Sequence, residues 1–87
     1  MTKLNLNDLM IFYTVVKEGS IKSAAIELGM SPQSMRSAAT RLEMSMGKIL
    51  FLNGERGLVI NGEGKKLFEQ IQKPMREMIN ASQGLAG

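Results

Sequence analysis

The chain has 87 residues, which suits one small domain, and its 44% hydrophobic and 22% charged residues are typical of a folded globular protein rather than a disordered one. It contains no cysteine and no histidine, which excludes disulfides, thiol nucleophiles, structural zinc sites and the usual imidazole base. The net charge of +3 permits an anionic partner without requiring one.

The first predicted helix begins after Asn5 or Asn7, either of which can cap it, and ends at Gly19. Asp8 adds negative charge near the positive end of the helix dipole. Apolar residues recur at the spacing of one helical face, so we expect this helix to be deeply packed. That stripe consists of Leu6, Leu9, Met10, Tyr13 and Val16, and it is widened by Phe12 and Val15.

Two further helices follow with only a short turn between them. Ser20 can cap the second helix, which ends at Gly29, and Ser31 can cap the third, which ends at Gly47. Pro32 stands at the first position of the third helix, where a missing N–H costs nothing. Two helices joined by a short turn that contains glycine form a helix-turn-helix. The residues expected to point inward are Ile21, Ala24, Ala25 and Leu28, then Met35, Ala39, Leu42 and Met46.

A β-hairpin is predicted after the third helix. Two short apolar runs, residues 48–52 and 58–60, flank the turn residues 53–57. A hairpin in this place is a wing, so the predicted fold is a mainly α winged helix-turn-helix. It has a three-helix core, a small hairpin wing and a long C-terminal helix.

The last predicted helix is capped by Asn61 and starts near Gly62. Pro74 interrupts it and should kink it, because the proline ring clashes with the preceding turn, and residues 82–87 resemble a frayed end. Lysines and glutamates alternate along it, so it lacks the strong basic face of a membrane-surface helix. Its apolar stripe is therefore the predicted dimer interface, made of Leu67, Phe68, Ile71, Met75, Met78 and Ile79.

The third helix carries a short polar face opposite its apolar one. Arginine can pair with guanine and glutamine with adenine in the major groove of DNA, and serine and threonine can reach base edges or phosphates. Backbone N–H groups at the helix start also favour a phosphate. For an isolated amphipathic helix, a merely solvated polar face is the more common explanation.

Several motifs in a fixed order resemble the N-terminal winged helix-turn-helix domain of LysR-type bacterial transcriptional regulators over residues 6–71. They are "LMIFYTVVKEGSIKSAA", "MSPQSMRSAATRLE", "GKILF", the Arg56-Gly57 pair and "VINGEGKKL". Together with the turn at Gly29 and the wing, this resemblance favours DNA binding over a solvated face. The predicted DNA contacts are Ser20, Lys22, Ser31, Pro32, Gln33, Ser34, Arg36, Ser37, Thr40, Arg41 and Arg56.

The resemblance implies how the parts act. The third helix would enter the major groove, and Arg56 at the wing tip would enter the neighbouring minor groove, which attracts arginine. The fourth helix would pair antiparallel with a second copy, so a homodimer would bind a pseudo-palindromic operator. Residues 1–61 would be the DNA-binding domain and residues 62–87 the linker and dimerisation helix. The larger domain that binds a small-molecule inducer in full-length members is absent from this chain.

This chain departs from the family pattern within the predicted interface. Pro32 stands where glutamine is usual, Arg36 and Ser37 stand in reversed order, and Asn53 replaces an arginine. With the modest charge, these departures leave a second hypothesis open. The chain could be a protein-interaction module that dimerises with a full-length relative and modulates it.

Other function classes find little support in the sequence. No carboxylates pair in an evident cleft and no P-loop is present, so we expect no enzyme, and we expect neither a metal nor a cofactor. We see no signal peptide and no apolar run near the ~20 residues that a membrane span needs, so we expect a cytoplasmic protein.

Overall fold

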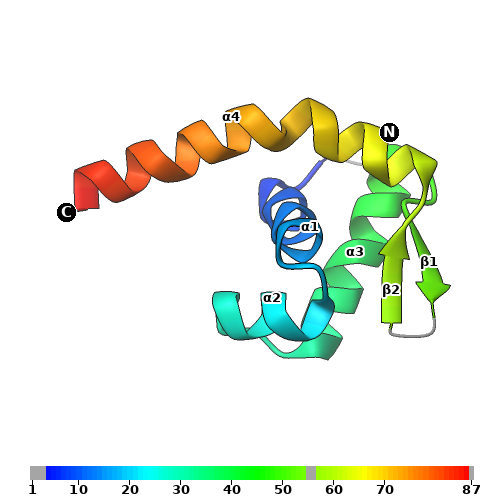
Figure 1. The fold of residues 1–87 in the computed structure, drawn as a ribbon. Helices are drawn as coiled ribbons and strands as arrows, with labels where there is room; N and C mark the ends of the chain where they lie inside the picture. The colour runs from blue at the N-terminus through cyan, green and yellow to red at the C-terminus, as the bar shows by residue number, and fades with distance from the viewer. Residues whose placement is uncertain (1–3, 55–56, 87) are drawn as a thin grey trace.

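The structure is a computed structural model that describes residues 4–54 and 57–86. Three helices come first: α1 (Leu6–Glu18), α2 (Ile21–Leu28) and α3 (Pro32–Met46). An antiparallel hairpin of β1 (Phe51–Gly54) and β2 (Gly57–Ile60) follows, and then the long helix α4 (Gly62–Ala86). Figure 1 shows α1 between α2 and α4, with the hairpin beside α3. The predicted winged helix-turn-helix fold is confirmed.

The helix boundaries follow from local chemistry. The side chains of Asn5, Ser20 and Ser31 each accept a backbone N–H from the first turn of the helix that follows, so Asn5, not Asn7, caps α1. Gly29 then ends α2 with a φ of 65°, a left-handed conformation that glycine adopts without strain. Its N–H bonds back to the last turn of α2, which lets the chain turn so that α3 starts three residues later.

The core lies where α1, α2 and α3 meet the base of the hairpin. Its largest fully buried side chains are Phe12, Met35, Leu42 and Leu50, and the Phe12 and Phe51 rings meet edge to face with centroids 5.5 Å apart. The apolar stripe predicted for α1 is only partly correct, because Leu6 is 70% exposed and Met10 is 36% exposed. Phe12, Tyr13 and Val15 of the predicted stripe are buried, and so is Ile11, which the prediction did not include.

The reason is that α1 contacts other helices on two sides. Ile11, Phe12 and Val15 face the core, whereas Tyr13 faces α4 and stacks on Phe68 with ring centroids 5.6 Å apart. Helical periodicity predicts an apolar stripe, but it does not choose between neighbours that lie on different sides of one helix.

The first strand of the wing begins three residues later than predicted. Residues 48–50 are not a strand, because their backbone groups form hydrogen bonds with Glu43 and Asn61 rather than with a neighbouring strand. The N–H groups of Leu50 and Phe51 donate to Oε2 of Glu43 at 2.8 and 3.1 Å, and Asn61 Nδ2 donates to the Ile49 carbonyl at 2.7 Å. The hairpin then pairs Phe51 with Ile60.

Helix α4 starts as predicted and continues further. Asn61 caps it by accepting the Gly64 N–H at 2.9 Å. The predicted interruption at Pro74 is wrong, because the helix runs through it to Ala86, so residues 82–86 are helical rather than frayed. Proline removes one N–H donor and crowds the preceding turn, but the apolar residues on both sides of it still pack against the rest of the chain. No helix within the described residues is long and apolar enough to cross a membrane.

Candidate nucleic-acid interface

The polar residues expected to contact DNA gather along the solvent side of α3. The opposite side of this helix is in the core, where Met35, Ala38 and Leu42 are fully buried. Helical periodicity therefore turns the intervening positions outward. We call this surface the α3 face, and its exposed residues are Pro32, Gln33, Ser34, Arg36, Ser37, Thr40 and Arg41.

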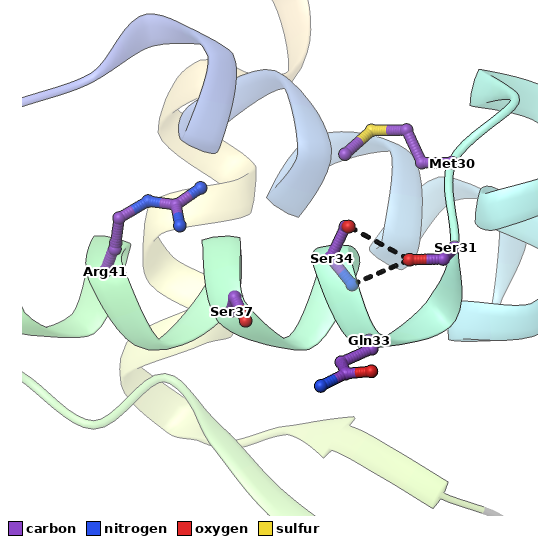
Figure 2. A pocket seen from close by; sticks show the side chains of 6 residues that line it. All are labelled: Met30, Ser31, Gln33, Ser34, Ser37 and Arg41. Carbon is purple, nitrogen blue, oxygen red and sulfur yellow. Dashed lines mark hydrogen bonds between the residues drawn. The ribbon is translucent and has the colours of Figure 1, made fainter.

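The two flanks of the α3 face have different neighbours. Ser34 and Arg41 lie on the flank toward α1, and Figure 2 shows them on the same side of the helix while Gln33 points away from them. Arg36 lies on the flank toward the wing, where it lines a hollow together with Asn53. Each flank thus carries one guanidinium, so an anion on either side of α3 would meet a positive charge.

The first turn of α3 is organised by two serines. The Ser31 hydroxyl accepts the backbone N–H of Ser34 at 3.1 Å and donates to the Ser34 hydroxyl at 2.9 Å, as the dashed lines in Figure 2 show. The Ser34 hydroxyl therefore keeps its own hydrogen for a further acceptor. Together with the N–H groups of the helix start, this donor favours a phosphate oxygen at this place.

Arg41 is held by a residue of α1. Its Nε donates to Oδ2 of Asp8 at 3.1 Å, and its Nη2 donates to Oδ1 at 3.0 Å. This hydrogen bond and the charge of Asp8 raise the pKa of Arg41 above its ordinary value. Arg41 therefore stays charged, as arginine side chains do in proteins generally.

The remaining predicted contacts are less closely grouped. Ser20 accepts the Ser23 N–H at 3.0 Å, so its hydroxyl already caps α2, and Lys22 is exposed in the first turn of that helix. Thr40 donates to the carbonyl of Arg36 at 3.1 Å, which leaves its oxygen to accept. Arg56, the predicted minor-groove contact, lies outside the described residues.

Sequence reasoning missed the roles of two carboxylates. Asp8 was interpreted as a helix-dipole charge, yet it is only 2% exposed and binds a residue of α3. Glu43 holds two backbone N–H groups at the base of the wing. The only local signal for Asp8 was a charge next to the apolar stripe, because its partner lies 33 residues away.

The predicted dimer interface is divided between two environments. Leu67, Phe68 and Ile71 pack against the core of their own chain, and Met75 is 5% exposed. Met78, by contrast, is 58% exposed at the edge of an apolar groove between α1 and α4. Other groove residues are Leu6, Leu9, Met10, Tyr13, Leu28, Met75 and Ile79. The groove is thus lined by α1 and α4 together with Leu28 of α2, and within it Leu6 and Met78 are exposed, whereas Met75 is buried.

Residues 4–54 and 57–86 hold no group of three acidic, cysteine or histidine side chains that could bind a metal ion. The α3 face itself offers hydrogen bonding and positive charge, through side chains such as Gln33, Arg36 and Arg41.

Comparison with known proteins gives concordant matches. A family model described as "Bacterial regulatory helix-turn-helix protein, lysR family" matches residues 6–65. The chain is 33% identical over 79 residues to the uncharacterized HTH-type transcriptional regulator YusT of Bacillus subtilis, covering 91% of this chain and 27% of that protein. It is also 33% identical over 84 residues to the HTH-type transcriptional activator AmpR of Rhodobacter capsulatus. This match covers 97% of this chain and 29% of AmpR. The chain therefore spans less than a third of the length of these relatives.

Solved structures agree on the fold. The full-length Vibrio cholerae virulence activator AphB superposes with a TM-score of 0.89 at 20% identity, over 94% of this chain and 28% of that one. The BenM DNA-binding domain, solved as a complex with catB site 1 DNA, superposes with a TM-score of 0.74 at 23% identity. This match covers 97% of this chain and 98% of the BenM chain. At these identities the likeness shows the fold alone.

Proposed function

This chain belongs to the LysR family of bacterial helix-turn-helix regulatory proteins, and we propose that it binds double-stranded DNA sequence-specifically, as a dimer on a pseudo-palindromic operator. The observation that carries the proposal is the α3 face, which is exposed, polar and flanked by Arg36 and Arg41. The BenM domain that shares this fold was solved bound to DNA, which supports the same use of the fold here.

The α3 face suits the major groove, whose base edges carry an unambiguous pattern of donors and acceptors. Gln33, Arg36 and Ser37 are the residues that would read bases, because they are exposed on α3 and each carries a hydrogen-bonding side chain. Ser31 and Ser34 at the helix start would contact a phosphate. The proposed contact of Arg56 with the minor groove rests on the sequence.

We assign the two ends of the chain different roles. Residues 1–61 would bind DNA, and residues 62–87 would be the linker and dimerisation helix. Since the relatives are more than three times longer, an inducer-binding domain would act through this helix in a full-length protein.

The direct test is selection of duplexes from a random-sequence DNA pool, followed by binding in a series of salt concentrations. We expect an enriched motif with two-fold symmetry and a logarithm of affinity that falls linearly with the logarithm of salt. Absence of binding at low salt by a folded, dimeric chain would contradict the proposal. It would favour pairing with a full-length relative instead.

Changing Arg36 to alanine is expected to weaken binding to the selected duplex by about 5- to 100-fold, because one good base contact contributes about 1–3 kcal/mol of discrimination. Preference at one position of each half-site should relax as well. The measurement is fluorescence anisotropy with the selected duplex and single-base variants of it.

Lys73→Ala is the matched control, since it removes the same charge from an exposed position on α4. Its effect should be small and independent of sequence. Equal losses for Arg36→Ala and Lys73→Ala would show that Arg36 contributes only net charge.

Changing Met78 to lysine is expected to weaken dimerisation. Exposed apolar residues of α1 and α4 meet at the groove, and Leu6 and Met78 are 70% and 58% exposed in the single chain. A second α4 would cover them, and a stable interface of about 800 Å² per partner would be disrupted by a buried, unpaired charge.

Light scattering over a range of concentrations measures this shift toward monomer. Asn80→Lys adds the same charge on the opposite side of α4 and should leave the dimer intact. A monomeric wild-type chain, or equal effects of both variants, would contradict dimerisation through this groove.

A further inference from the structure

Asp8 and Arg41 form an ion pair with very unequal exposure. The Asp8 side chain is 3% exposed, whereas that of Arg41 is 58% exposed. Both carboxylate oxygens accept a hydrogen bond from Arg41, at 3.0 and 3.1 Å, so the contact is bidentate. One edge of the guanidinium is thus fixed to α1 while the rest of it faces solvent.

This geometry restricts the arginine. A guanidinium is planar and carries five N–H donors, and Asp8 accepts two of them. The others, on Nη1 and the outer side of Nη2, project from a group whose orientation is set by two hydrogen bonds. An arginine that is already ordered loses less conformational entropy when it binds an anion.

The place of Arg41 determines which anion it can meet. It lies on the flank of the α3 face toward α1, four residues after Ser37 and seven after Ser34, so the three line one hollow. Asp8 holds its guanidinium toward α1. Figure 2 shows the Arg41 side chain rising from α3 on the same side as Ser34. The Arg41 guanidinium would then lie beside α3, the helix that would enter the major groove. The DNA backbone would run along that side of the helix.

Building on the proposed DNA binding, we propose that Asp8 is a positioning residue that holds Arg41 against a phosphate of the DNA backbone, rather than against a base. The ligand is a phosphodiester oxygen, and the outward-facing donors of Arg41 would bind it next to the Ser34 hydroxyl. Asp8 itself touches no DNA and acts only through Arg41.

The sign of one substitution separates positioning from simple charge. Asp8→Asn removes a negative charge close to the proposed interface, so electrostatics alone predicts tighter DNA binding. Positioning predicts weaker binding, because an amide offers one acceptor oxygen and no charge to hold the guanidinium. The matched control is Glu69→Gln, which removes the same charge from an exposed position on α4.

The experiment measures binding of the 87-residue chain to a labelled duplex of mixed sequence and to the duplex selected by the wild-type chain, over a salt series. We expect Arg41→Gln to bind both duplexes about tenfold more weakly, with the salt slope reduced by about one for each subunit. Asp8→Asn should lose several-fold, and Glu69→Gln should bind as well as wild type or better. Asp8→Asn should add no further loss to Arg41→Gln, because its effect passes through Arg41.

Folding is checked for each variant by its thermal midpoint, and binding is measured below the lowest midpoint. Arg41→Lys keeps a positive charge that can pair with Asp8, but an ammonium group cannot form the bidentate contact that fixes a guanidinium. This variant should therefore bind DNA about as weakly as Asp8→Asn. Binding of Asp8→Asn or Arg41→Lys at the wild-type level would overturn the proposal, and so would a loss from Asp8→Asn that persists in the Arg41→Gln background. In those cases DNA binding by the wild-type chain still stands, whereas failure of the wild-type chain to bind either duplex would overturn both.

Discussion

Gly64→Ala is expected to lower the free energy of unfolding by about 2–4 kcal/mol, a large share of the ~5–10 kcal/mol typical of a domain this small. A Cβ atom at this position would overlap the carbonyl oxygen of Leu50 and lie 3.1 Å from Cβ of Ile60. The Leu50 carbonyl cannot move freely, because it accepts the Asn61 N–H at 2.9 Å. The first turn of α4 would have to move away from the wing.

Urea denaturation measures this effect, and Gly62→Ala is the control. Gly62 lies two residues earlier in α4, and an added Cβ there has no neighbour within 4 Å. That change should be neutral or stabilise the protein by up to about 1 kcal/mol, because alanine favours the helix more than glycine does. Similar midpoints for the two variants would mean that α4 does not approach the wing as closely as described.

Glu43→Ala is the second change with a large expected effect, about 2–4 kcal/mol of destabilisation. Oε2 of Glu43 accepts the N–H groups of Leu50 and Phe51, both of which are buried residues. Alanine would leave both donors without a partner, and each unsatisfied buried group costs about 1–3 kcal/mol. Glu43→Gln keeps an acceptor oxygen without the charge and should cost less, about 1 kcal/mol.

Two measurements check the role of Glu43. The thermal midpoint should fall by roughly 8–30 °C, since about 1 kcal/mol corresponds to roughly 4–8 °C in a domain of this size. Hydrogen exchange should accelerate at the Leu50 and Phe51 amides while the amides in the middle of α1 stay protected. Glu69→Ala, an exposed carboxylate on α4, should change neither. Unchanged protection of the Leu50 and Phe51 amides in Glu43→Ala would contradict this role.

The helix boundaries and the α3 face could be predicted from the sequence because they depend on neighbouring residues. Ser31 caps a turn that lies three residues away, and Gly29 ends its helix through its own backbone conformation. The exposed positions of α3 follow from a single periodicity, since only one side of that helix meets the core. The family likeness rests on the same local motifs.

Errors arose where a residue has partners that are distant in the sequence. Residues 48–50 were expected to be a strand from their apolar character, but Glu43 and Asn61 take their hydrogen bonds. Pro74 was expected to interrupt α4. The helix instead continues through Pro74, and its residues beyond the proline lie beside α1. Hydrophobic character predicts burial in such segments, and it does not say which polar groups will satisfy the backbone.

The sequence by itself determined the order of the elements, the caps that separate them and the set of side chains on the α3 face. These properties depend on contacts within about one helical turn, so the spacing of neighbouring residues in the sequence predicts them. Only the tertiary structure decided that Asp8 holds Arg41, that Glu43 closes the base of the wing and that α4 shares a groove with α1. Each of these joins residues from different elements, and which elements meet is settled by packing of the whole core rather than by any local pattern.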